Sequence, residues 1–201
     1  MLKVAVKLPA LTGDVGEYLA DVTALEAAGA DAIWVDDNAL EPWVMLGALG
    51  AVTHRVGLGY RLTSPDLWPA ARLGPCAAAI QTLSRGRLVV GLPPQGAHED
   101  QLAALRSAGA RIFSVGSPSA SADGVILAAE SAGQLSGVAG AATETWAAIA
   151  APPDRDAWKS TLSSYEAAGA IGVIVPWSVR LIDLLRNPEP DDRSDLLIAT
   201  G

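Results

Sequence analysis

Polar side chains that could bind a ligand or move a proton recur just after apolar, strand-like segments of this 201-residue chain. In the first such segment, residues 3–8, lysines alternate with valines, so the lysines share one side of the strand and the valines the other. If the valines face helices, Lys7 points inward at the end of the strand. A lysine there could pair with an anionic substrate or cofactor group, or form a Schiff base if desolvated. A solvated or ion-paired lysine is the simpler interpretation.

Asp36, Asp37 and Asn38 follow the second segment, residues 32–35. Their side chains could accept a proton or hold a substrate hydroxyl. Together with Glu41 they could also attract a cation. Carboxylates in front of a helix usually act as caps and partners of the helix dipole, so we predict no metal site.

Tyr60, Arg61 and Thr63 follow the third segment. Arg61 is the best phosphate or carboxylate ligand among them, because its planar fork can make two parallel hydrogen bonds. A surface arginine in a loop is the alternative. His98 begins the helix after the fourth segment and is the acid–base candidate, although a surface histidine would look the same in the sequence.

Later segment ends add weaker candidates for cofactor binding. Gly116, Ser117 and Ser119 offer a glycine, two hydroxyls and turn amides to a phosphate, but too few residues follow for a full helix whose N-terminus would strengthen the site. Trp177 follows the last segment, and its indole could stack on a planar ring. We predict packing roles for the tryptophans at positions 34, 43, 146 and 158.

These segments belong to a helix–glycine–strand unit that occurs at residues 26–35, 107–115 and 166–175. Alanine and glutamate favour the helix, and the glycine (29, 109 or 169) can end it in the left-handed conformation. The apolar run that follows is typical of a strand buried on both faces. Repeated units of this kind predict an α/β fold with a parallel sheet.

The whole chain reads as eight strands with helices in most of the connections. The strands are expected at residues 3–8, 32–35, 56–60, 87–92, 112–115, 123–127, 146–150 and 172–176, and the helices at about 14–28, 42–53, 68–83, 98–107, 152–168 and 178–185. Eight parallel strands close into a barrel. We therefore predict a minimal (β/α)8 TIM barrel over residues 1–186 with abbreviated crossovers, followed by a proline-rich acidic tail, 187–201. An open doubly wound sheet is the alternative, but Gly57-Leu-Gly59 lacks the third glycine of the dinucleotide fingerprint.

Composition limits the partners. The formal charge is −8, which opposes binding to nucleic acid or to anionic membrane surfaces. The chain shows neither a signal peptide nor about 20 consecutive apolar residues. Cys76 is the single cysteine and is expected to be a buried, inert thiol. We expect a cytoplasmic protein.

Three stretches carry a resemblance to a known family. They are Glu26-Ala-Ala-Gly-Ala-Asp-Ala-Ile-Trp-Val35, residues 48–59, and Ala77-Ala-Ala-Ile-Gln-Thr-Leu-Ser-Arg-Gly-Arg-Leu-Val-Val-Gly-Leu92. Residues 115–127 match more loosely. In these stretches the chain resembles the luciferase-like monooxygenase superfamily of flavin- and deazaflavin-dependent barrel enzymes, and looks like a shortened member.

The resemblance implies an oxidoreductase or monooxygenase that uses FMN or a deazaflavin, coenzyme F-420, with a small organic substrate. It also implies a homodimer through the second and third helices. Two alternatives stay open: a degenerate barrel that binds a ligand or partner without cofactor or catalysis, and a cofactor-free lyase or isomerase that uses Lys7 with Asp36. The degenerate barrel is favoured by Asp37-Asn38, where many members have Asp-His, and by Pro93-Pro94, which offer no N–H.

Overall fold

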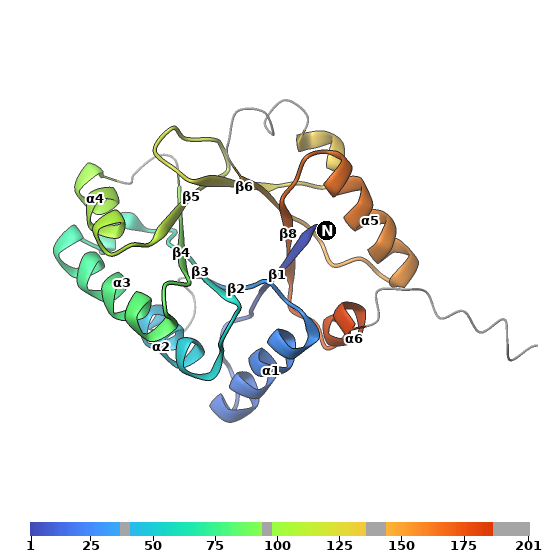
Figure 1. Ribbon diagram of the computed structural model, residues 1–201, viewed down its shortest axis with the longest axis horizontal. Helices are drawn as coiled ribbons and strands as arrows, with labels where there is room; N and C mark the ends of the chain where they lie inside the picture. The colour runs from blue at the N-terminus through green and yellow to red at the C-terminus, as the bar shows by residue number, and fades with distance from the viewer. Residues whose placement is uncertain (37–40, 94–97, 136–143, 187–201) are drawn as a thin grey trace, which may run out of the picture.

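The computed structural model describes residues 1–36, 41–93, 98–135 and 144–186. Eight parallel strands form a closed barrel in chain order, with β8 paired to β1, and helices lie around its outside (Figure 1). The predicted (β/α)8 barrel is therefore confirmed. The strands are β1 (Lys3–Lys7), β2 (Ala32–Asp36), β3 (Gly57–Arg61), β4 (Leu88–Leu92), β5 (Arg111–Val115), β6 (Gly124–Ala128), β7 (Thr145–Ala148) and β8 (Gly172–Pro176).

The helices occupy most of the connections. They are α1 (Val15–Ala28), α2 (Pro42–Val52), α3 (Ala70–Ser84), α4 (Glu99–Ser107), α5 (Arg155–Ala167) and α6 (Arg180–Arg186), with 3-10 turns η1 (Pro65–Leu67) and η2 (Ala132–Leu135). In the described part of the chain, no helix is both long and apolar enough to cross a membrane.

The repeated unit behaves as its sequence predicts. Gly29, Gly109 and Gly169 follow α1, α4 and α5 with φ values of +104°, +76° and +87°. The left-handed conformation turns the chain directly into β2, β5 and β8. Helix starts follow local chemistry too, since the carboxylates of Asp14 and Asp154 accept hydrogen bonds from the amides of the third residue along in α1 and α5.

The abbreviated crossovers are also present. Residues 116–123 join β5 to β6 without a helix, and η2 is the only helical turn described between β6 and β7. Element ends differ from the predicted ones by up to three residues. For example, β7 ends at Ala148, whose register partner on β8 is Ile174, although the apolar run continues to Ala150.

The two faces of each strand lie in different cores. In β1, Val4 and Val6 pack in the outer core between sheet and helices, whereas Ala5 packs inside the barrel. This alternation confirms the predicted facing of the valines, and it puts Lys7 on the inward side at the carboxyl end of the strand.

Large indoles fill the barrel interior where neighbouring strands carry glycine. A Cβ on Gly59 would lie 2.2 Å from Trp34, and one on Gly172 would lie 2.5 Å from Trp146. Phe113 packs with both tryptophans in the inner core, so the barrel is filled by side chains rather than open along its axis. The indoles of all four tryptophans assigned to packing are buried.

At the amino end of the barrel, a buried carboxylate joins the end of α1 to the segment that leads into β3. The Glu26 carboxylate, at the end of α1, accepts hydrogen bonds from the backbone N–H groups of His54, Arg55 and Val56 at 2.9, 2.6 and 3.0 Å. Burial raises the pKa of Glu26, but these three hydrogen bonds and the charge of Arg87 together lower it by more. The pKa of this carboxyl therefore lies below its ordinary value.

Arg87 completes this junction. Its guanidinium donates to the backbone oxygens of Gly50, Thr53, Val56 and Ser84 at 2.6–3.2 Å, and to the Thr53 hydroxyl. The Leu-Ser-Arg-Gly-Arg stretch that carries the family resemblance therefore has a structural role, because it delivers a guanidinium to the unpaired carbonyls at the end of α2.

We expect Glu26→Gln to lower the free energy of unfolding by about 1–3 kcal/mol, because charged hydrogen bonds to buried amides are lost. Since the pKa of Glu26 is lower in the folded protein than its ordinary value of 4.5, Glu26 stabilises the fold fully at pH values above about 4.5. This stabilisation is lost as the pH falls through the pKa of the folded state. Urea unfolding from pH 3 to 7 measures both effects. Glu17→Gln, an exposed change in the same helix, is the control. Equal stability of the two variants across this range would contradict the assigned role.

Candidate active site

Three charged side chains meet at the carboxyl ends of β1, β2 and β3. Lys7 Nζ lies 2.9 Å from Asp36 Oδ2, and Arg61 Nη2 lies 2.7 Å from the same oxygen. We call Lys7, Asp36 and Arg61 the mouth cluster. Asp36 and Arg61 are register partners on β2 and β3, while Lys7 pairs with Trp34, because the strands of a barrel are staggered.

The acidic side chain of the mouth cluster is buried, whereas its two basic side chains are partly exposed to solvent. The Asp36 side chain is 9% exposed, whereas those of Lys7 and Arg61 are 41% and 38% exposed. Two cations share one carboxylate, so the cluster carries a net charge of about +1 at neutral pH. Arg61 Nε is buried and has no acceptor among the described residues. An anionic group arriving from the mouth would meet charge that is only partly compensated.

Three other predicted residues do not join the cluster. The Tyr60 ring is buried in the outer core, with its centroid 5.0 Å from that of Trp43, because it follows the outward side of β3. The Trp177 indole packs against the same outer core, although its backbone N–H donates to the Lys7 carbonyl oxygen at 2.8 Å. Thr63 is exposed in the loop after β3. Asn38 lies outside the described residues.

The remaining candidates lie in separate surroundings. His98 is exposed at the start of α4, with Nε2 3.6 Å from Asp66 Oδ1. Gly116 and Ser117 are in the connection after β5, where φ of Gly116 is +98°. The Ser119 hydroxyl lies 2.9 Å from that of Ser121, within the same connection.

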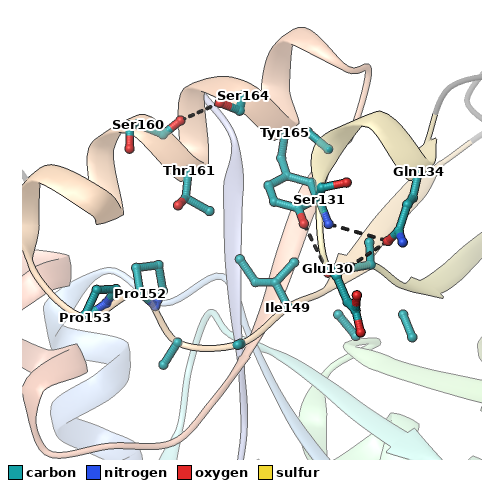
Figure 2. Close-up of a pocket in the computed structure, with 16 residues that line it drawn as sticks. Glu130, Ser131, Gln134, Ile149, Pro152, Pro153, Ser160, Thr161, Ser164 and Tyr165 are labelled. Atoms are coloured by element: carbon teal, nitrogen blue, oxygen red, sulfur yellow. Dashed lines mark hydrogen bonds between the residues drawn. The ribbon is translucent and has the colours of Figure 1, made fainter.

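The carboxyl ends of β6 and β7 border a cavity with a volume of about 860 Å³ (Figure 2). One wall is the side of α5 that carries Ser160, Thr161 and Ser164, and the opposite wall is the chain around η2. Ala128 and Ala148, which end β6 and β7, also line it, and Ala148 packs against the inner core of the barrel. We call it the β6–β7 cavity.

Hydrogen bonds hold the lining of this cavity in place. Gln134 Oε1 accepts from the amides of Glu130 and Ser131 at 2.7 and 3.4 Å. The Tyr165 hydroxyl donates to the Ala129 carbonyl oxygen at 3.1 Å across the cavity wall. Burial raises the pKa of Tyr165, so this hydroxyl stays a donor at neutral pH.

Sequence reasoning did not identify these lining residues, because serine, alanine and glutamine in a connection carry no specific signal.

Two other kinds of site are not supported. Within residues 1–36, 41–93, 98–135 and 144–186, no three His, Cys, Asp or Glu side chains gather as metal ligands would. Burial raises the pKa of the Cys76 thiol, and Glu41 adds to this while Arg72 opposes it, so the thiolate is disfavoured. Cys76 lies in α3, outside the mouth cluster.

Comparisons with solved structures agree on the fold. The chain is similar to the coenzyme F420-dependent tetrahydromethanopterin reductase from Methanopyrus kandleri, with 11% identity, a TM-score of 0.69 and coverage of 92% of this chain and 96% of that one. It is similar to an F420-dependent secondary alcohol dehydrogenase in complex with an F420-acetone adduct, with 13% identity, a TM-score of 0.71 and coverage of 94% and 99%. Tryptophan synthase from M. tuberculosis is more distant, with 17% identity, a TM-score of 0.53 and coverage of 92% and 86%.

Sequence comparison is more specific about ancestry. No curated protein sequence matches the chain. Residues 6–105, which run from β1 to α4 and include the mouth cluster and the Glu26–Arg87 junction, match the model of the luciferase-like monooxygenases. With the closed barrel, this match shows that the chain belongs to the luciferase-like monooxygenase superfamily.

Proposed function

We propose that the chain is a flavin- or deazaflavin-dependent oxidoreductase that acts on a small organic substrate. The observation that carries the proposal is the pairing of the mouth cluster with the β6–β7 cavity at the carboxyl end of a luciferase-like barrel, the end at which barrel enzymes hold their active sites. Two of the structures it resembles are named as F420-dependent enzymes, a reductase and an alcohol dehydrogenase, which supports the same class.

The residues present fit such a cofactor. The β6–β7 cavity is within the range of about 300–1,000 Å³ typical of cofactor sites. Its alanines leave room for a flat ring system, and Ser131 and Thr161 place hydroxyls along its walls. The buried Nε–H of Arg61, without an acceptor among the described residues, suits a ligand oxygen at the mouth.

When bound, a reduced flavin or deazaflavin supplies the hydride. The protein groups would then bind and orient. Ser131 and Thr161 would hold the cofactor in the β6–β7 cavity, and Tyr165 would keep the cavity wall closed through its bond to Ala129. Asp36 would keep Lys7 and Arg61 aimed at the mouth.

A cofactor-free lyase is less well supported. A Schiff base requires a free lysine amine, and the Lys7 amine is engaged in an ion pair with Asp36 at 2.9 Å. A degenerate barrel remains the competing outcome of the cofactor test.

Titration of the purified protein with FMN and with coenzyme F-420 tests the proposal. We expect one of them to show a perturbed absorbance spectrum and micromolar affinity. Ser164→Trp should fill the β6–β7 cavity and weaken that binding about tenfold or more. Ser163→Trp, the neighbouring exposed residue of α5 that does not line this cavity, should leave the affinity within about twofold. An unperturbed spectrum with both cofactors would favour a degenerate barrel.

We also propose a homodimer through α2 and α3. These helices pack side by side (Figure 1). They carry the exposed apolar side chains Val44 and Leu83, of which Val44 is 71% exposed. Apolar side chains gathered on neighbouring helices are typical of an association surface.

Light scattering should give twice the chain mass at micromolar concentration. We expect Val44→Glu to shift the protein to monomer, because an unpaired carboxylate would be buried in the interface. Val179→Glu changes a valine that is 81% exposed near α6, and it should leave the dimer intact. A wild-type monomer across this range, or equal effects of the two variants, would contradict the interface.

A further inference from the structure

The mouth cluster carries information about the substrate that the family match does not. We infer that it binds the carboxylate of the substrate, and that the substrate is a small monocarboxylic acid with an apolar body. This inference names a substrate class for the proposed oxidoreductase and rests on that function for its biological meaning.

The first step is the arrangement of donors. Lys7 and Arg61 approach the same oxygen of Asp36, so the two cations are close neighbours. Among the described residues, Asp36 is the only side chain paired with either of them. An ammonium has three N–H donors and a guanidinium has five, so most donors of both groups are left for another acceptor.

The second step is charge. Asp36 compensates one of the two cations, and the like charges of Lys7 and Arg61 repel each other at short range. A second carboxylate would neutralise the remaining positive charge and offset the repulsion between the two cations. Because Asp36 is buried beneath them, it holds both bases in place before the ligand arrives, which lowers the ordering cost of binding.

The third step is the rest of the mouth. The inward residues nearest the carboxyl ends of the other five strands carry no charge: Gly91, Val115, Ala128, Ala148 and Pro176. Within the described residues, no further lysine or arginine ends a strand, so one negative charge matches the site and a doubly charged group would be left partly uncompensated. The apolar residues suit an apolar body attached to the carboxylate.

The same strand supplies a matched control. Lys3 is the first residue of β1 and Lys7 is the last, and both lie on the inward side of the strand. Lys3 is therefore at the amino end of the barrel, opposite the mouth cluster. Neutralising either lysine changes the total charge equally, and only Lys7 belongs to the mouth cluster. A difference between the two variants therefore reports a local contact rather than overall charge.

Cofactor-free protein should be titrated with benzoate, with its neutral analogue benzamide and with inorganic phosphate, with calorimetry for affinity and the ¹⁵N–¹H resonance of Arg61 Nε as a local readout. We expect benzoate to bind about tenfold more tightly than benzamide and phosphate, and to shift the Arg61 resonance. Lys7→Gln and Arg61→Gln should each weaken benzoate about tenfold, Lys7→Arg should retain binding, and Lys3→Gln should stay within about twofold.

Several outcomes would overturn the inference. Equal affinity for benzoate and benzamide would show that the carboxylate is not recognised. Equal losses of benzoate affinity in Lys3→Gln and Lys7→Gln would show that only the overall charge of the protein matters. If Lys7→Gln weakens FMN but not riboflavin, and phosphate competes with FMN, the cluster serves a cofactor phosphate instead. Thermal unfolding of each variant checks folding, with Arg61→Gln as the second variant if Lys7→Gln is unstable. Failure of both cofactors to bind would sink the proposed function and leave the benzoate result to decide this inference.

Discussion

The closed barrel depends on a volume constraint at its centre. Trp34 and Trp146 can point inward only because Gly59 and Gly172 lie opposite them, where any Cβ would overlap the indole rings. Once these pairs are in register, the inward and outward sides of every strand are set, since side chains alternate with a period of two. The same register brings Lys7, Asp36 and Arg61 to one end, so the packing of the interior and the composition of the mouth have a common origin.

The two ends of the barrel use one chemical device for different purposes. At the amino end, the Glu26 carboxylate is saturated by three amide donors, and the Arg87 guanidinium by backbone oxygens. At the carboxyl end, the Asp36 carboxylate gathers two cations whose other donors remain available. Charged groups whose hydrogen-bonding capacity is used within the protein stabilise the fold, whereas charged groups with free donors are available to a ligand. This difference agrees with the usual division in such barrels between a face that provides stability and a face that holds the active site.

The connection after β6 contributes to the site. A full helix after β6 would cover the outer side of the barrel next to α5, and here the described part of that connection is the single turn η2. The face of α5 that carries Ser160, Thr161 and Ser164 borders the β6–β7 cavity, opposite the chain around η2 (Figure 2).

Local propensity and alternation along the strands were enough to predict the barrel, the repeated helix–glycine–strand unit and the side of β1 on which Lys7 lies. Which polar residues meet could not be predicted, because it depends on how the strands pair in the closed barrel. The tertiary structure joined Lys7, Asp36 and Arg61 through the stagger of the strands, turned Tyr60 and Trp177 toward the outer core, and left His98 at an exposed helix start. The β6–β7 cavity was likewise invisible in the sequence, since its walls come from segments that approach each other only when the barrel closes.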